Sequence, residues 1–170
     1  MSLHEIVGCG ARPYPPSGLE SDNCTIWFMS DHSAADPKET TQVVHLVVFC
    51  GFVGSGKTSL AVEAAKTWPG EWDRCCQDEM KSRQSVERRA RASLLDGRHV
   101  LIDRTNMDRQ QRAIWLSLAA DVRQVRSVVT SLIHVDVPPE ICYERLLHRQ
   151  GHPTLRTPEQ AHRYVHSTMN

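Results

Sequence analysis

The feature that most constrains this chain is a G-x-x-x-x-G-K-[ST] motif over residues 51–58, which comes directly after an apolar run over residues 43–50. The run is rich in valine and nearly unbroken, as is typical of a strand buried on both faces. Residues 59–67 are compatible with a helix, and Pro69 and Gly70 would end it. A strand, a glycine-rich loop and a helix in this order are typical of a phosphate-binding loop. The sequence therefore predicts an α/β fold that binds a nucleoside triphosphate.

The residue types of the motif suit a polyphosphate. Glycines let the backbone wrap the phosphates, and successive N–H groups at the start of a helix point toward the anion. Lys57 is expected to reach the β- and γ-phosphates, and Thr58 to ligate Mg²⁺. The other nucleotide-binding residues expected in the motif are Gly51, Gly54, Ser55, Gly56 and Ser59. The predicted cofactors are ATP, or another nucleoside triphosphate, and Mg²⁺.

Strand-like and helix-like segments alternate along the chain from residue 43 onward. Apolar runs predict strands at 43–50, 72–76, 99–103 and 128–137. Helices are predicted at 57–67, 81–96, 108–121, 138–149 and from residue 157 on. Asn106 is the expected cap of the helix at 108–121. Alternation of this kind predicts an α/β fold with a parallel sheet of four to five strands and helices on both faces.

The chain is expected to form one domain preceded by an irregular extension. Residues 1–42 hold four of the nine prolines and show little periodicity, so we expect a partly flexible segment with an edge strand at 24–29. Residues 43–170 are expected to form the phosphate-loop domain, with a lid around residues 145–156, where glycine and proline follow a helix. A chain of 170 residues is long enough to bury a substantial core.

The charge is balanced overall but unevenly distributed. The chain has 20 Lys and Arg against 20 Asp and Glu, so its net charge argues neither for nor against a nucleic-acid partner. Residues 81–126 hold eleven basic and five acidic residues, whereas residues 1–42 hold two basic and six acidic residues. The basic surplus follows the phosphate loop, where an acceptor would approach, although arginines of this kind also coat solvated helix faces.

The cysteines and the apolar segments indicate the compartment. The six cysteines show no C-x-x-C spacing, which favours reduced thiols in an intracellular protein over a disulfide framework. The first residues lack a basic region followed by an apolar stretch, so no signal peptide is expected, and no apolar run is long enough to span a membrane. We expect a cytoplasmic or nuclear protein without a membrane partner.

Two carboxylates follow predicted strands and are candidates for chemistry. Ligands of parallel α/β sheets bind at the carboxyl ends of the strands, where both Asp78 and Asp103 fall. Asp103, at a strand end facing the phosphate loop, is expected to organise Mg²⁺, whereas Asp108 is expected to cap a helix. Asp78 suits a general base that accepts the proton of an acceptor hydroxyl, and a helix cap is the alternative.

A basic segment lies at the end of the helix predicted at 138–149. It contains Arg145 and Arg149, followed by Gly151 and Pro153, so it is suited to close over a nucleotide. We expect Arg149 to stabilise charge on the transferred phosphoryl group and Arg145 to assist at the nucleotide. The alternative is an exposed basic helix end that complements the helix dipole.

These motifs resemble those of the P-loop polynucleotide 5′-hydroxyl kinases, the phage and DNA-repair end-healing kinases, with kinship to zeta-toxin-like kinases. The resemblance covers about residues 43–166. Residues 102–106 (Ile-Asp-Arg-Thr-Asn) are similar to the family's Asp-x-Thr-Asn element, and residues 78–81 (Asp-Glu-Met-Lys) are similar to its Asp-x-x-Arg element. Arg145 and Arg149 fall at the spacing of the family's lid arginines.

The resemblance implies roles for individual residues. Asp78 would be the general base, and Lys57 and Arg149 would also serve catalysis. Lys81 stands where the family has an arginine that holds the acceptor's 3′-side phosphate, so the charge is kept but the bidentate fork is lost. The element at residues 152–155 (His-Pro-Thr-Leu) is not part of the family's pattern. The residues expected at the substrate are Lys81, Arg83, Arg104, Asn106 and Arg109.

The resemblance implies a polynucleotide 5′-hydroxyl kinase, which moves the γ-phosphate of ATP or another nucleoside triphosphate to the 5′-OH end of RNA or DNA. The acceptor end is expected to be single-stranded or otherwise exposed. One alternative is a small-molecule P-loop kinase of the zeta-toxin or sugar-kinase kind, because the fold supports many acceptors. Another is a non-catalytic nucleotide-binding module that gates a partner through residues 1–42. The motifs do not distinguish RNA from DNA, because the 2′-hydroxyl leaves no signature in them.

Overall fold

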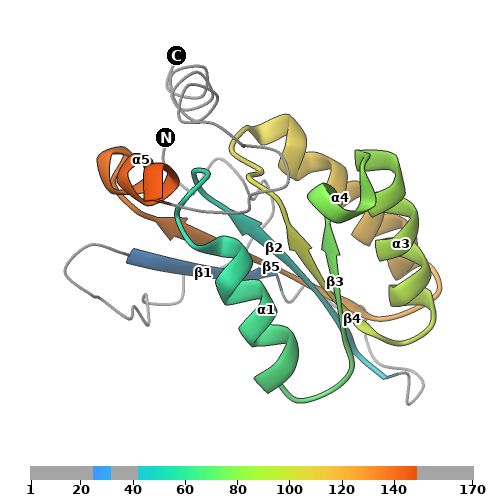
Figure 1. Ribbon diagram of the computed structural model, residues 1–170. Helices are drawn as coiled ribbons and strands as arrows, with labels where there is room; N and C mark the ends of the chain where they lie inside the picture. The colour runs from blue at the N-terminus through green and yellow to red at the C-terminus, as the bar shows by residue number, and fades with distance from the viewer. Residues whose placement is uncertain (1–24, 32–41, 149–170) are drawn as a thin grey trace.

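The computed structural model describes residues 25–31 and 42–148, which form a five-stranded sheet with helices on both faces (Figure 1). The strands are β1 (Thr25–Asp31), β2 (Val44–Cys50), β3 (Trp72–Cys76), β4 (His99–Asp103) and β5 (Val128–Asp136). The helices are α1 (Lys57–Thr67), α2 (Gln77–Met80), α3 (Arg83–Leu95), α4 (Arg109–Arg123) and α5 (Pro139–His148). Within these residues, no helix has both the length and the apolar character needed to cross a membrane.

The sheet has the strand order β1-β5-β2-β4-β3, with β2 at its centre. Strands β5, β2, β4 and β3 run parallel to one another, so the chain crosses over through a helix between them. β1 pairs antiparallel with β5, from Thr25 opposite Asp136 to Asp31 opposite Thr130. The predicted α/β fold is confirmed, and so is the edge strand expected at 24–29. The domain boundary after residue 42 stays a prediction, because most of the expected extension lies outside the described residues.

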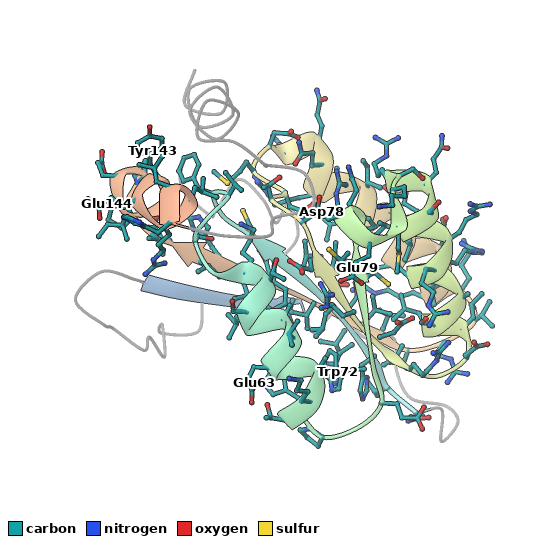
Figure 2. The ribbon with its side chains drawn as sticks, in the orientation of Figure 1. Glu63, Trp72, Asp78, Glu79, Tyr143 and Glu144 are labelled. Atoms are coloured by element: carbon teal, nitrogen blue, oxygen red, sulfur yellow. The ribbon has the colours of Figure 1, made fainter. Side chains whose placement is uncertain are left out.

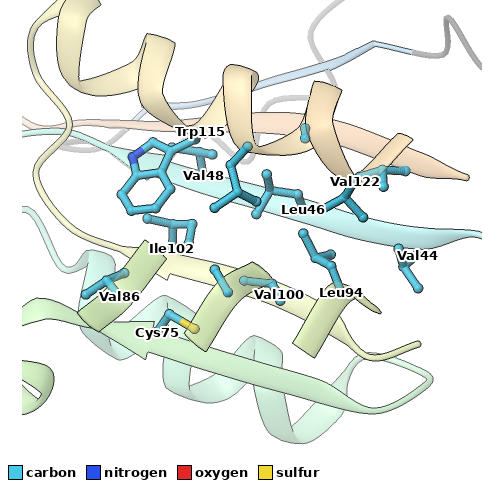
Figure 3. Close-up of a cluster of buried hydrophobic side chains, with 14 residues drawn as sticks. Val44, Leu46, Val48, Cys75, Val86, Leu94, Val100, Ile102, Trp115 and Val122 are labelled. Atoms are coloured by element: carbon cyan, nitrogen blue, oxygen red, sulfur yellow. The ribbon is translucent and has the colours of Figure 1, made fainter. Parts of the chain in front are cut away.

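Two apolar clusters fill the space between the sheet and the helices. On one face, α3 and α4 contribute Val86 and Trp115, which pack with Val48 of β2 (Figure 3). On the other face, Ala61 of α1 packs with Phe49 of β2, and α5 joins the same cluster. Neighbouring β2 residues thus serve opposite faces, as the two-residue period of a strand requires. The apolar run before the glycine-rich motif is therefore the buried central strand that its composition predicts.

The register of the sheet brings three strand ends together. Val48 of β2 pairs with Ile102 of β4, and Cys76 of β3 pairs with Asp103 of β4. The phosphate loop after Cys50, the carboxylate of Asp103 and the start of α2 therefore meet at one edge of the sheet. This edge is where parallel α/β sheets bind their ligands.

The helix predicted at 81–96 begins two residues later than expected. Lys81 has a left-handed backbone, with φ of 66°, and ends α2 as its C-cap. The new helix α3 starts at Arg83, where Ser82 Oγ accepts a hydrogen bond from Ser85 N at 3.1 Å. The chain thus turns between α2 and α3, and Asp78 lies on a separate helix of a single turn.

A half-buried histidine at the amino end of β4 predicts a pH-dependent stability. His99 Nδ1 accepts a hydrogen bond from the backbone N–H of His45 at 3.1 Å, and burial, together with the charge of His45, lowers the pKa of His99. The folded chain therefore keeps His99 neutral where the unfolded chain takes up a proton. The free energy of unfolding should fall as the pH drops below about 6.5. In urea unfolding, His99→Asn, which keeps an acceptor that does not titrate, should lessen this fall.

A second histidine contributes to the same measurement. Burial also lowers the pKa of His134, so part of the pH dependence should remain in the His99→Asn chain. A His99→Asn chain that loses stability with acid as steeply as the wild type would contradict the assignment.

Candidate nucleotide and acceptor site

Backbone contacts hold the phosphate loop in place from two sides. Gly51 donates its N–H to Thr105 O at 3.0 Å, which ties the loop to the segment after β4. Gly54 lies against α5, because a Cβ on Gly54 would stand 2.5 Å from the carbonyl oxygen of Cys142. Gly51, Gly54 and Gly56 have φ values of 142°, 86° and 100°, in the region that favours glycine. Gly51 and Gly54 are therefore required by both the backbone path and the close packing, and Gly56 by the backbone path alone.

Replacing Gly54 with alanine should destabilise the fold more than replacing Gly56 with alanine. Both positions have positive φ, but a Cβ on Gly56 would meet nothing within 4 Å, whereas one on Gly54 would meet backbone. Overpacking of this kind costs about 1–3 kcal/mol. Urea unfolding of the two variants should show the difference. Equal losses would mean that the loop can move away from α5 without cost.

The phosphate loop concentrates positive charge around the start of α1. Lys57 is 6% exposed, and its Nζ donates to Phe52 O at 2.5 Å and to Ser55 Oγ at 3.3 Å. Arg145 of α5 donates from Nη1 to Ser55 O at 3.4 Å. The N-terminus of α1, where Gly56 is the N-cap, adds the positive end of the helix dipole. This combination favours an anion such as a polyphosphate.

Thr58 and Asp103 supply oxygen atoms side by side. Thr58 lies in the first turn of α1, and its Oγ1 donates to Oδ1 of Asp103 at 3.2 Å. Asp103, the last residue of β4, is 5% exposed. Hydroxyl and carboxylate oxygens are ligands that suit Mg²⁺, which usually keeps several waters and binds phosphate oxygens as well. The residues present therefore fit the magnesium site predicted from the sequence.

Asp78 shares a pocket with the phosphate loop. Figure 2 shows Asp78 and its neighbour Glu79 on α2. The N-caps of α2 and α3 are Cys76 and Ser82, so the helix-cap alternative for Asp78 is wrong. A half-buried carboxylate beside a phosphate-binding loop is suited to accept a proton from a hydroxyl group. The pocket is lined by Val53, Gly54, Gly56, Lys57, Thr58, Ser59, Asp78, Asp103, Arg104 and Thr105.

Arg74 of β3 is a residue of this site that the sequence analysis missed. Its Nη1 donates to Asp103 Oδ2 at 2.6 Å, and its Nη2 donates to Glu79 Oε1. The Arg74 side chain is 16% exposed and that of Asp103 is 3% exposed. In the sequence, Arg74 is visible only as an arginine inside a five-residue strand. Its contact with Asp103 depends on the register between β3 and β4.

Three basic residues expected at the acceptor are exposed at helix ends and do not line the pocket. Lys81 follows α2, with its Nζ 3.5 Å from Asp78 O. Arg83 is the first residue of α3 and forms an ion pair with Glu87 at 2.8 Å. Arg109 is the first residue of α4. The structure thus brings these basic residues to helix ends beside the carboxyl edge of the sheet.

Arg104 and Asn106 occupy different environments. Arg104 lines the pocket, and its guanidinium lies 5.9 Å from the centre of the Trp115 ring. Asn106 is fully buried, with Nδ2 donating to Phe49 O at 2.8 Å and Oδ1 accepting from Trp115 Nε1 at 2.9 Å. Its buried side chain joins the segment after β4 to the core. The expected contact of Asn106 with the substrate is therefore corrected to a structural role. The expected helix cap at Asn106 is also wrong, because Asp108 caps α4 and its Oδ1 accepts from the N–H of residue 111 at 2.6 Å.

The described residues end inside the expected lid. α5 ends at His148, so Arg149, the rest of the lid segment at 149–156 and the His-Pro-Thr-Leu element at 152–155 lie outside the described part of the chain. Arg145 is described and contacts the phosphate loop at Ser55 O, and its role at the nucleotide stays a prediction. The catalytic role of Arg149 stays a prediction.

Comparison with known sequences identifies a family. A family profile described as "AAA domain" matches residues 46–170. The chain is also similar to the protein named Transcription factor bHLH140 of Arabidopsis thaliana, with 31% identity over 112 residues. That match covers 63% of this chain and 12% of the relative, so this chain spans a small part of the relative's length.

Comparison with solved structures identifies the same fold. A chain of the Pnkp1/Rnl/Hen1 complex superposes with a TM-score of 0.55 at 21% identity, covering 68% of this chain and 43% of that chain. A chain of the Pnkp1/Rnl/Hen1 RNA repair complex superposes with a TM-score of 0.53 at 20% identity, covering 79% of this chain and 47% of that chain. This chain thus spans less than half of either matched chain. The profile covers most of the sequence, including the phosphate loop, so the chain belongs to this AAA domain family and has its P-loop kinase-like fold.

Proposed function

We propose that this chain is a polynucleotide 5′-hydroxyl kinase, which transfers the γ-phosphoryl group of ATP or another nucleoside triphosphate to the 5′-OH end of RNA or DNA. The observation that carries the proposal is the shared pocket, in which Lys57 and Thr58 of the phosphate loop lie together with Asp78. A phosphate loop alone indicates nucleotide binding. A carboxylate in the same pocket adds the group that an alcohol acceptor needs to lose its proton.

In the proposed reaction, the 5′-oxygen of the acceptor attacks the γ-phosphorus while Asp78 accepts the hydroxyl proton. The bond between the γ-phosphorus and the bridging oxygen breaks, and that oxygen leaves with its electron pair on the nucleoside diphosphate. Lys57 and the loop N–H groups stabilise the charge on the β- and γ-phosphates. Arg145, already in contact with the loop at Ser55 O, supports a role for α5 beside the nucleotide.

Mg²⁺ would be held at Thr58 and Asp103, whose facing oxygens lie 3.2 Å apart at the pocket. When bound, the ion neutralises charge on the β- and γ-phosphates. Asp103 is fixed at a strand end and Thr58 at the start of a helix, so both ligands are supported by rigid elements. Their placement supports ATP with Mg²⁺ as the cofactors.

Basic residues at the carboxyl edge of the sheet support a polynucleotide as the acceptor. Lys81, Arg83 and Arg109 lie at helix ends, and Arg104 lies in the pocket itself. Lysine and arginine side chains that neutralise backbone phosphates give nucleic-acid binding that weakens with salt. One of the structurally similar chains belongs to an assembly described as an RNA repair complex, which supports the same class of acceptor.

The test is transfer of label from γ-labelled ATP to an oligonucleotide with a 5′-OH end, in RNA and DNA form. We expect labelled product with Mg²⁺, less product as salt is added, and none from the same oligonucleotide with a 5′-phosphate. Labelling of small alcohols but of neither oligonucleotide would replace the proposal with a small-molecule kinase. Nucleotide binding without transfer to any acceptor would favour a non-catalytic module.

A further inference from the structure

The guanidinium of Arg74 contacts Asp103, which faces the phosphate loop, and Glu79, which lies next to Asp78. Arg74 donates from Nη1 to Asp103 Oδ2 at 2.6 Å and from Nη2 to Glu79 Oε1. Asp103 in turn accepts a hydrogen bond from Thr58 of the phosphate loop, and Glu79 is adjacent to Asp78 on α2. We propose that Arg74 is a positioning residue, which orients Asp103 toward the phosphate loop and holds the helix that carries Asp78.

Asp103 depends on Arg74 for its orientation. The Asp103 side chain is 3% exposed, and its two oxygens have different partners: Oδ1 accepts from Thr58 at 3.2 Å and Oδ2 accepts from Arg74 at 2.6 Å. Without Arg74, the carboxylate keeps one neutral partner and loses the cation that offsets its buried charge. The guanidinium therefore keeps Oδ1 of Asp103 directed at the phosphate loop.

The short helix α2 needs contacts beyond its own hydrogen bonds. It has four residues, none of them buried, and its N-cap makes no side-chain hydrogen bond. Met80 packs on the core at the end of α2, and the pair between Arg74 and Glu79 fixes a second point. The Glu79 side chain is 61% exposed, and exposed ion pairs add little to stability. The expected effect of this pair is on the position of Asp78 and not on folding.

Arginine is suited to this role because its planar fork can serve two carboxylates at once. Two Nη atoms point to Asp103 and Glu79, whereas lysine has a single nitrogen on a flexible stem. Arg74→Lys should therefore keep the charge and one of the two contacts. Arg74→Met removes both contacts with little change in side-chain length.

A matched control is the ion pair of Asp73, the neighbour of Arg74 on β3. Arg89 of α3 pairs with Asp73 at 2.6 Å, the same distance as the Arg74–Asp103 pair, and neither Arg89 nor Asp73 lines the pocket. Arg89→Met thus removes an ion pair from β3 without touching the proposed site. Glu79→Gln isolates the contact with α2, because it leaves the Arg74–Asp103 pair intact.

The first measurement is steady-state transfer of phosphate to a 5′-OH oligonucleotide, and this part rests on the proposed function. Arg74→Met should lower kcat about 100-fold, with the KM for ATP changed by less than about threefold, because misplacing reacting groups by about 1 Å has an effect of this size. Arg74→Lys should recover part of kcat, and Glu79→Gln should lower it by less than Arg74→Met. Arg89→Met should keep the wild-type kcat.

The second measurement is independent of any acceptor. Binding of a non-hydrolysable ATP analogue is followed by calorimetry as Mg²⁺ is varied. Loss of the guanidinium leaves the charge of Asp103 uncompensated, so Arg74→Met should need about three- to tenfold less Mg²⁺ for half-maximal binding. Glu79→Gln and Arg89→Met should titrate like the wild type. If Arg74 served only to stabilise the fold, Arg74→Met would weaken binding of the ATP analogue at every Mg²⁺ concentration.

Two results would overturn the inference: wild-type kcat and Mg²⁺ dependence in Arg74→Met, or equal kinetic losses in Arg74→Met and Arg89→Met. If Arg74→Met does not fold, Arg74→Lys and Glu79→Gln carry the kinetic readout, because both should lower kcat while Arg89→Met does not. If the wild-type protein phosphorylates no 5′-OH end, the proposed function fails. The Mg²⁺ titration then still decides whether Arg74 acts on Asp103.

Discussion

Asp78→Asn should lower kcat for 5′-phosphorylation by about 10²- to 10⁴-fold, the range expected when a general base is lost. Asparagine keeps the shape of the side chain but cannot take up the hydroxyl proton. The KM for ATP should change by less than about threefold, because Lys57 and the loop N–H groups that bind the phosphates are unaltered. Label transfer at saturating ATP and oligonucleotide measures the first effect, and a titration of ATP measures the second.

Asp108→Asn is the matched control for Asp78→Asn. Asp108 is exposed, caps α4 through the N–H of residue 111 and does not line the pocket. Asparagine caps helices about as well as aspartate, so both stability and kcat should stay at the wild-type level. Transfer at the wild-type rate by Asp78→Asn would remove Asp78 from the mechanism and leave Asp103 as the remaining carboxylate of the pocket.

Lys57→Met should lower kcat by about 10²- to 10³-fold, the loss typical of a removed group that stabilises developing charge. Lys57 is buried in the loop, so its ammonium acts in a water-poor environment where its attraction to phosphate is strong. Methionine keeps the length of the side chain without the charge. Affinity for the ATP analogue, measured by calorimetry, should fall together with kcat.

Lys66→Met is the control for Lys57→Met, since Lys66 is exposed in the last turn of the same helix. It should bind the nucleotide and transfer phosphate like the wild type. Loss of transfer in Lys57→Met with unchanged nucleotide affinity would place Lys57 at the transferred group alone. Full activity in Lys57→Met would contradict the assignment of this pocket to the donor.

The parts of this molecule that depend on local pattern could be predicted from the sequence. The valine-rich run before residue 51 specifies a strand buried on both faces, and the glycines after it specify the loop. Asp78 and Asp103 could be found because Asp103 ends a strand and Asp78 closely follows one, and parallel strands share one carboxyl edge. The meeting of Thr58 with Asp103 follows from that shared edge.

The parts that depend on distant contacts could not be predicted. Arg74 matters because of its contact with Asp103 on the adjacent strand, 29 residues along the chain. Asn106 reads as a helix cap or a substrate contact, but its amide is held by Phe49 O and the Trp115 indole, which only the folded core brings together. Lys81 takes a left-handed backbone that sequence patterns assign to glycine or asparagine, so the break before α3 carried little local signal.

The antiparallel strand β1 bears on how the domain avoids self-association. It covers the outer edge of β5, a nine-residue strand whose backbone groups would otherwise lie open on that side. An open edge of this length is a template for pairing with another chain. A chain shortened to begin at residue 43 would keep every residue that lines the pocket and yet be prone to aggregate. β1 thus protects one edge of the sheet, whereas the residues that line the pocket all belong to later parts of the chain.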